Sequence, residues 1–252
     1  MLAAAFADIS LLQIGLVAGL ALVASVIGGV AGYGTGALMP LLLVPMVGAE
    51  KVVPIVAISA IFTNFGRAAA FFAHIDRRRA AIVLVASIPT CIVSAYGYTL
   101  LTGKGAALAI GAMLILTVPL RHLLKARTTL IGDRGLIAGA AGYGAAVGGT
   151  VGAGVILLSV LMAAGLQGAA VVATDAMVSI VICLVRFAVF GVAGALDATI
   201  VALGMLIGLV AIPGAFAARL LVDRLPLRAH TAILDVVVVA GGLVMVVGAL
   251  RA

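Results

Sequence analysis

Charged side chains are scarce in this chain. Asp, Glu, Lys and Arg make up 9% of the 252 residues, whereas apolar residues make up 65% and tryptophan is absent. A water-soluble domain carries about 25% charged residues, so the composition excludes that class. The sequence indicates an all-α polytopic membrane protein whose main partner is the lipid bilayer.

Residues that build metal centres, disulfides and hydrolytic sites are also rare. Cys91 and Cys183 lie inside apolar segments, where a free thiol behaves as a small hydrophobic group, so we expect no disulfide, metal site or cofactor. An intramembrane hydrolase needs a serine with a histidine base, or paired aspartates, within reach. Each of His74, His122 and His230 lies beside a basic cluster at the end of an apolar segment. The pattern therefore disfavours an enzyme.

The formal net charge is +7, which in a soluble protein would suggest binding to nucleic acid. A nucleic-acid-binding surface is a solvated face, whereas these basic residues lie between apolar segments. We therefore assign the charge to membrane topology and expect no nucleic-acid partner. Ten of the fifteen Lys and Arg residues fall in three clusters, namely Arg77, Arg78 and Arg79; Arg121, Lys125, Arg127 and Arg134; and Arg219, Arg224 and Arg228.

Charged residues, glycines and prolines divide the chain into ten apolar segments around one charged linker. A membrane helix needs about 20 apolar residues. The first half gives segments at 9–31, 36–49, 51–73, 80–101 and 105–120, and the second half at 135–150, 152–165, 168–192, 198–221 and 229–250. We therefore expect two membrane repeats, residues 1–120 and 135–252, joined by a cytoplasmic linker at 121–134.

Five segments in each half make the second repeat inverted relative to the first. Positive charge near membrane spans is generally cytoplasmic, and the three basic clusters are separated by two and then four segments. These even numbers agree with a cytoplasmic location for all three clusters, whether each Gly-rich pair of segments crosses the membrane fully or dips in and returns, because both leave the chain on its starting side. Whether segments 36–49 and 152–165 cross fully or re-enter stays open. The pattern predicts that both termini are non-cytoplasmic.

Glycine is concentrated at two places. The stretch GGVAGYGTGALMP at 28–40 has five glycines in nine positions, and the string AGYG returns at 141–144 before another glycine cluster. Such breaks can expose backbone N–H groups to an anion, but small residues also allow close helix packing. Both interpretations stay open. The first assigns substrate binding to Gly34, Thr35, Gly36, Gly149 and Thr150.

Polar residues form a stripe on the third segment of each half. On a helix that advances about 100° per residue, Asp175, Ser179 and Arg186 fall within about 40° of one another, with Cys183 beside them. An ionisable residue inside a span tends to face a partner or a water-filled path, and arginine binds oxyanions through forked donors. The alternative is that each arginine snorkels to the membrane interface. The corresponding stripe in the first half contains Ser59, Thr63 and Arg67, with Asn64 on its flank.

Asp175 has two interpretations. It could neutralise Arg186, although eleven residues correspond to about 16 Å of helix rise, which is too far for a direct bridge within one helix. It could instead be a protonatable group that couples transport to a proton gradient.

The order of these motifs resembles the sulfite exporter TauE/SafE family of transporters. The resemblance rests on GGVAGYGTGALMPLLLVP, on VVPIVAISAIFTNFGRAAAFFAHIDRRRA, and on two such halves joined by a basic linker. The second half departs from the pattern, since GGTVGAGVILL lacks the prolines found at Pro40 and Pro45. The resemblance implies transport of small sulfur-containing or organic anions such as sulfite, sulfoacetate and other sulfonates across the bacterial inner membrane.

We therefore expect a multi-pass secondary carrier with alternating access that binds its anion through Arg67, Arg186, Thr63, Asn64 and Ser179. A channel for small anions is the alternative. A carrier should saturate and show counterflow, whereas flux through a channel should be fast and uncoupled. The identity of the anion, the direction of transport, the coupling ion and the oligomeric state stay open.

Overall fold

The structure, a computed structural model, describes residues 10–31, 35–125, 130–221 and 227–251. These residues form ten α-helices, one short 3-10 helix and no strand, which confirms the all-α prediction. The helices are α2 (Leu11–Ala31), α3 (Thr35–Val47), α4 (Ala49–Ala70), η1 (Phe72–His74), α5 (Arg77–Thr99), α6 (Gly103–Lys125), α7 (Asp133–Gly149), α8 (Gly154–Ala163), α9 (Ala169–Val192), α10 (Ala198–Leu221) and α11 (Leu227–Arg251). Each of the ten expected segments corresponds to one α-helix.

The helices fall into long and short classes. Within the described residues, α4, α5, α6 and α9 are long and apolar enough to cross a membrane. By contrast, α3 has 13 residues and α8 has 10. Helices of these lengths rise about 20 Å and about 15 Å, less than the roughly 30 Å of a bilayer's hydrocarbon core. Neither short helix can cross that core alone.

Helix boundaries differ from the expected segments by up to five residues, and the largest difference is at the end of α6. The fifth segment was expected to end at residue 120, but α6 continues to Lys125. The added residues, RHLLK, include Leu, Arg and Lys, which favour helix. Charge marks where a helix leaves an apolar environment, but it does not by itself end the helix.

The turns that begin the third and fourth helices of each half use the same residue types. Gly48 and Gly168 precede α4 and α9 with φ of 85° and 55°, a conformation that glycine adopts without steric cost. Asp76 precedes α5 and accepts a hydrogen bond from the Arg79 backbone N–H (2.9 Å). Asp197 precedes α10 and accepts one from the Ile200 backbone N–H (2.7 Å). These carboxylates cap the first turns of α5 and α10.

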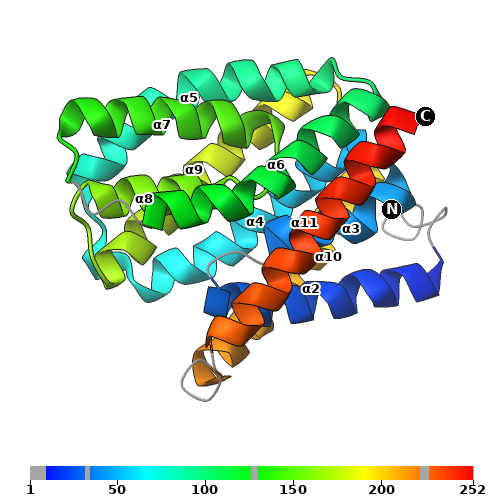
Figure 1. The fold of residues 1–252 in the computed structure, drawn as a ribbon, viewed down its shortest axis with the longest axis horizontal. Coiled ribbons are helices and arrows are strands. Elements are labelled where there is room, and N and C mark those ends of the chain that lie inside the picture. Colours follow the sequence, from blue (N-terminus) through cyan, green and yellow to red (C-terminus); the bar gives the residue numbers. More distant parts are fainter. Residues whose placement is uncertain (1–9, 32–34, 126–129, 222–226, 252) are drawn as a thin grey trace.

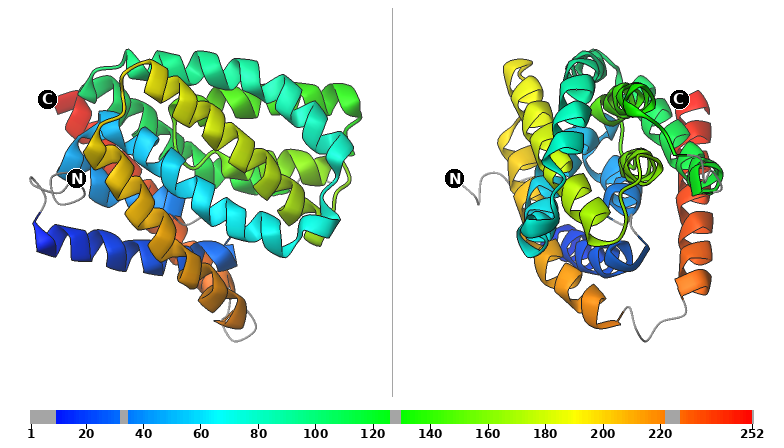
Figure 2. Two further views of the ribbon diagram at one scale, coloured as in Figure 1. Left: turned by 180° about the vertical axis from the view of Figure 1, so that it is seen from behind. Right: turned by 90° about the vertical axis from the view of Figure 1, so that its left-hand side faces the viewer.

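The helices form a bundle with α4 and α9 at its centre. Figure 1 shows α5 and α7 side by side along one edge and α2 along the opposite edge, while Figure 2 shows the same bundle from behind and from the side. The helix α4 packs against α9 and α10, α9 packs also against α5, α2 packs against α10, and α6 packs against α11.

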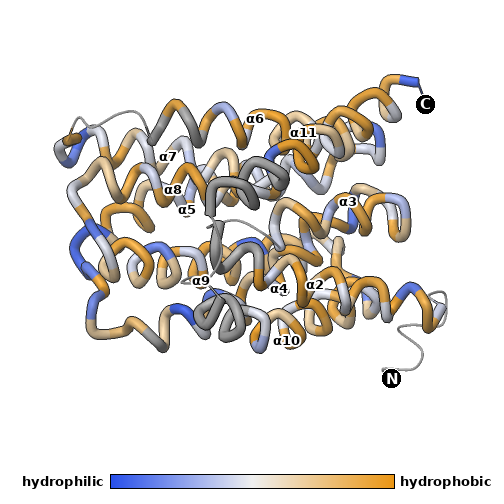
Figure 3. Tube along the Cα trace, turned by 60° about the horizontal axis from the view of Figure 1, so that its bottom comes forward, coloured by the Kyte–Doolittle hydropathy of each residue, from blue (hydrophilic) through white to orange (hydrophobic). Residues whose placement is uncertain are grey.

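The exterior of the bundle is apolar. Large hydrophobic side chains are exposed along several helices, including Val85 and Val93 on α5 and Val244 on α11. Figure 3 shows hydrophobic residues along much of the length of the helices. An exterior of this kind suits a lipid environment, where helices satisfy their backbone polar groups internally.

Candidate functional site

The two central helices run antiparallel, and each carries one of the two predicted arginines. Arg67 lies near the end of α4 and reaches Asp175, near the start of α9. Arg186 lies late in α9 and reaches the backbone carbonyl of Val53, near the start of α4. The two arginines therefore lie toward opposite ends of one helix pair.

Arg67 is paired with a carboxylate. Its Nη2 donates to Asp175 Oδ2 over 2.9 Å, and its Nη1 donates to Asn64 Oδ1 over 3.0 Å. The Asp175 side chain is 5% exposed and that of Arg67 is 36% exposed. Asp175 thus neutralises Arg67 on the neighbouring helix rather than Arg186 on its own helix.

Arg186 has a different environment. It is 3% exposed, and its Nη2 donates to the carbonyl oxygens of Thr150 (3.2 Å) and Val53 (3.4 Å). Its Nε has no hydrogen-bond partner, and among the described residues no carboxylate forms an ion pair with it. Because its head group is buried, Arg186 does not snorkel to the surface of the bundle.

The break between α7 and α8 lies directly beside Arg186. The helix α7 ends at Gly149, and Thr150 follows with extended backbone (φ −143°, ψ −175°), which turns its carbonyl toward the guanidinium. Gly152, with φ of 82°, completes the turn. A Cβ built on Gly36, in the first turn of α3, would lie 3.7 Å from the Gly152 nitrogen. The beginnings of the two short helices α3 and α8 are therefore neighbours.

Other glycines of the second cluster contact α5 instead. A Cβ on Gly144 or Gly148 would overlap the backbone of α5, and one on Gly149 would lie 3.0 Å from Ser94 Oγ. Thr90 and Ser94 of α5 donate to α7 carbonyls at Ala141 (2.9 Å) and Ala145 (2.6 Å). These contacts support the packing interpretation for this part of the cluster. The break itself falls just after it.

The remaining predicted residues lie on α4 and α9 or beside the short helices, and two of the hydroxyls already have local partners. The hydroxyls of Thr63 and Thr150 donate to helix carbonyls at Ala60 (3.3 Å) and Ala146 (2.6 Å). Ser179 lies near the buried Tyr143. Thr35 begins α3, and Gly34 lies outside the described residues. The structure thus groups Thr63, Asn64, Arg67 and Asp175 at one end of the α4–α9 pair, and Arg186, Thr150 and Gly36 at the other.

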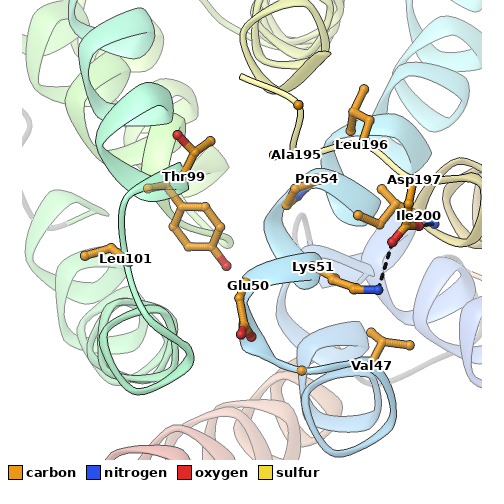
Figure 4. Close-up of a pocket in the computed structure, with 13 residues that line it drawn as sticks. Val47, Glu50, Lys51, Pro54, Thr99, Leu101, Ala195, Leu196, Asp197 and Ile200 are labelled. Atoms are coloured by element: carbon orange, nitrogen blue, oxygen red, sulfur yellow. Dashed lines mark hydrogen bonds and ion pairs between the residues drawn. The ribbon is translucent and has the colours of Figure 1, made fainter. Parts of the chain in front are cut away.

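A pocket of about 350 Å³ opens beyond the Arg186 end of the pair, where α4 begins, α5 ends and α9 turns into α10. Figure 4 shows Lys51 bonded to Asp197 across it, and the Nζ–Oδ2 distance is 2.8 Å. Partial burial raises the pKa of Asp197, but the hydrogen bonds from Lys51 and the Ile200 backbone N–H outweigh it, so this pKa lies below the usual 3.8. Glu50 also lines the pocket.

A layer that contains Tyr98 separates the pocket from Arg186. The Tyr98 hydroxyl donates to the Ala49 carbonyl (2.5 Å), and its ring meets Phe190 edge to face with centroids 6.3 Å apart. Ala49 and Phe190 each lie four residues beyond the Arg186 contacts along α4 and α9, which is about 6 Å of helix rise. Tyr98 is 3% exposed although it lines the pocket.

Sequence reasoning missed Tyr98 and Tyr143 as neighbours of the arginines. Tyr143 belongs to the second AGYG string, whose glycines alone were considered, and it is 2% exposed. Cys183, which the sequence placed beside the polar stripe, does lie close to Arg186. In the described part of the chain no group of His, Cys, Asp and Glu is arranged to hold a metal ion.

Two further interactions lie at the Arg67 end of the bundle. Arg78 Nη2 pairs with Asp133 Oδ2 over 2.7 Å, which joins the start of α5 to the start of α7. Arg79 Nη1 pairs with Asp76 Oδ2, also over 2.7 Å. The first basic cluster and the start of α7 are therefore at the same end of the molecule.

Comparison with known proteins gives one match. A family model described as sulfite exporter TauE/SafE matches residues 17–245, which is most of the chain. No curated protein and no solved structure matches the chain.

Proposed function

The chain belongs to the sulfite exporter TauE/SafE family of membrane transporters for sulfite-like anions, and from this premise we propose that Arg186 binds the transported anion. The substrate is a small sulfur-containing or organic anion such as sulfite, sulfoacetate or another sulfonate. The protein works as a secondary carrier in the bacterial inner membrane.

The environment of Arg186 carries this proposal. Burying an unpaired charge away from water carries a desolvation penalty on the order of several kcal/mol. Two carbonyl oxygens satisfy only Nη2, and Nε is left without an acceptor. An oxyanion would supply both the missing charge and the missing acceptor, and the planar guanidinium fits its oxygens.

The two short helices support the same location. The first turns of α3 and α8 meet at Gly36 and Gly152, and Thr150, at the break before α8, holds Arg186. A helix N-terminus carries about half a positive charge and unpaired N–H groups, so two converging N-termini attract an anion. Glycine at the meeting point lets the anion approach the backbone closely.

The carrier consists of two inverted repeats, residues 1–120 and 135–252, which are joined by a linker at 121–134. The contacts between helices support this. If each helix is replaced by its counterpart in the other half, the contact between α2 and α10 becomes the contact between α7 and α5. In the same way, the contact between α4 and α10 becomes the contact between α9 and α5. Gly48 and Gly168 precede corresponding helices, as do Asp76 and Asp197.

Alternating access follows from the two ends of the α4–α9 pair. The pocket at Lys51 and Asp197 is the outer vestibule, and the Tyr98 layer is the barrier between it and Arg186. The ion pair between Arg67 and Asp175 closes the other, cytoplasmic end. Asn64, Thr63 and Ser179 belong to the same closure. Opening one end while the other stays closed would carry the anion across.

This orientation predicts a labelling pattern. Cysteines introduced at 102–104, beside the vestibule, should react with a membrane-impermeant reagent from outside. Cysteines at 124–130 should react only after the cytoplasmic side is opened. The reverse pattern would contradict the topology.

Transport by the purified protein in liposomes tests the function. Labelled sulfite or sulfoacetate should enter with saturable kinetics, and unlabelled anion inside should drive counterflow. Arg186→Gln should abolish uptake, whereas Arg134→Gln, at an exposed arginine in the second basic cluster, should leave it unchanged. Unsaturable flux without counterflow would indicate a channel, and movement of only cations or neutral solutes would refute the assignment.

A further inference from the structure

The ion pair between Arg67 and Asp175 uses only part of each group's bonding capacity. The guanidinium has five N–H donors, and the described bonds use one to Asp175 and one to Asn64. Only Oδ2 of Asp175 takes part in the pair. Arg67 is also 36% exposed, whereas Asp175 is 5% exposed. A forked arginine in contact with one carboxylate oxygen is still able to bind another oxyanion.

The matching position in the first half has no carboxylate. Asp175 lies eleven residues before Arg186 on α9, and the residue eleven positions before Arg67 on α4 is Val56, which is buried. Under the exchange of halves, Val56 therefore has the same relation to Arg186 as Asp175 has to Arg67. One arginine has a carboxylate from the opposite helix, and the other has a valine there.

We propose that Arg67 forms a second anion site whose resident anion is the Asp175 carboxylate, a tethered competitor of the transported substrate. This inference rests on the proposed function, because it assumes that the anion first recognised by Arg186 also passes Arg67. A carboxylate and a sulfite or sulfonate group present similar oxygens to a guanidinium. The anion binds Arg67 by displacing Asp175, and Asp175 returns to Arg67 when the anion leaves.

The two sites then differ in affinity. At Arg186 the anion meets a cation with which no carboxylate of the described residues forms an ion pair, so binding removes an unfavourable state. At Arg67 the anion must separate an existing pair and leave Asp175 buried without its cation, which is costly. The wild-type protein should therefore show one tight site and one much weaker site. The weak site favours release of the anion at the Arg67 end.

Equilibrium binding of labelled sulfite and of labelled sulfoacetate to the purified full chain measures both sites. Asp175→Asn removes the competing charge and keeps the side-chain shape. The second site should then tighten by roughly tenfold if the pair is formed about nine-tenths of the time, which brings the stoichiometry of tight binding toward two per chain. Adding Arg67→Gln to this variant should return it to one. Asp133→Asn, which removes the carboxylate of the exposed pair with Arg78, is the matched control and should keep the wild-type stoichiometry.

The reciprocal variant keeps the inference testable if Asp175→Asn fails to fold. Val56→Asp supplies the carboxylate that Arg186 lacks, and it should weaken the tight site by at least about tenfold by the same competition. Val56→Asn adds polarity without charge, and it should leave the affinity within a factor of about two, since it provides no competing anion.

The outcomes separate this inference from the proposed function. If Arg186→Gln loses the tight site and Asp175→Asn still has only one tight site, Asp175 is not a competitor of the anion, and the proposed function is retained. A second site that persists in the Asp175→Asn/Arg67→Gln variant, or wild-type affinity in Val56→Asp, would also overturn the competitor. A tight site that survives Arg186→Gln would instead refute the proposed function.

Discussion

Arg67 and Arg186 lie at corresponding positions late in α4 and α9, yet they differ in burial and in their hydrogen-bond partners. Arg67 is partly exposed and has a carboxylate on the neighbouring helix, whereas Arg186 is buried, donates to two backbone carbonyls and forms no ion pair with a carboxylate of the described residues. An ion pair does not by itself require a ligand, because each charge already has a partner. A buried guanidinium with an unpartnered Nε points to a ligand. The counterion, rather than the arginine itself, distinguishes the two ends.

Replacing each arginine with lysine should give the largest effect and the sharpest contrast. Lysine keeps the charge but loses the planar fork, so Arg186→Lys should lower the initial rate of uptake by more than about tenfold, an effect of about 1.4 kcal/mol. Arg67→Lys can still pair with Asp175 and should lose less. Initial rates at matched protein density in liposomes measure both. Wild-type rates for both variants would show that the two arginines do not bind the anion and have only a structural role.

The break beside Arg186 offers the next test. Gly152 has φ of 82°, and a non-glycine residue in that region costs roughly 1 to 2 kcal/mol. Gly152→Ala should therefore lower the melting temperature and slow uptake, because the strain displaces the Thr150 carbonyl that holds Arg186. Gly154→Ala is the matched control, since a Cβ there meets nothing within 4 Å and the residue is helical. Equal effects of the two substitutions would argue against a role for the break.

Tyr98 lies between Arg186 and the pocket, whereas Arg67 at the other end of the pair is 36% exposed. Tyr98→Ala should open the barrier, so that a cysteine placed at Thr150 becomes reactive toward a reagent from the pocket side. Tyr98→Phe keeps the ring against Phe190 and loses one hydrogen bond, worth about 1 kcal/mol, so it should stay closed. Unchanged labelling in Tyr98→Ala would show that Tyr98 is not the barrier.

The exposed pair between Lys51 and Asp197 should give the smallest effect. Both side chains are more than 40% exposed, and such pairs contribute roughly 0 to 1 kcal/mol. The pKa of Asp197 is lowered in the folded protein, so its contribution is present at neutral pH and is lost as the pH falls below about 4. The melting temperature of wild type should therefore fall toward that of Asp197→Asn as the solution is acidified. A constant difference between pH 7 and 3 would contradict this assignment.

Sequence patterns predicted the helices well and their contacts poorly. Apolar length and charge gave ten segments that each became a helix, because those signals are local. The pairing of Asp175 with Arg67 depends on the antiparallel register of α4 and α9, and the distance along a single helix could only exclude Arg186 as its partner. A periodic stripe predicts which side chains share a face, but not which helix lies opposite.

The glycine clusters show the same limit. Composition could not separate the packing interpretation from the binding interpretation, because glycine suits both. In the structure Gly144 and Gly148 approach α5, whereas Gly36 and Gly152 lie where the short helices begin. Only the neighbouring backbone distinguishes these glycines, and it comes from another part of the chain.

The most direct measurement is the position of a heavy substrate analogue in a crystal. Selenite has the shape and charge of sulfite, and its selenium gives an anomalous signal. An anomalous peak should lie beside Arg186, with an oxygen about 2.7 to 3.1 Å from Nε, next to Gly36 and Gly152. A peak at any other position, with Nε of Arg186 still unpartnered, would contradict the assignment of Arg186 as the anion receptor.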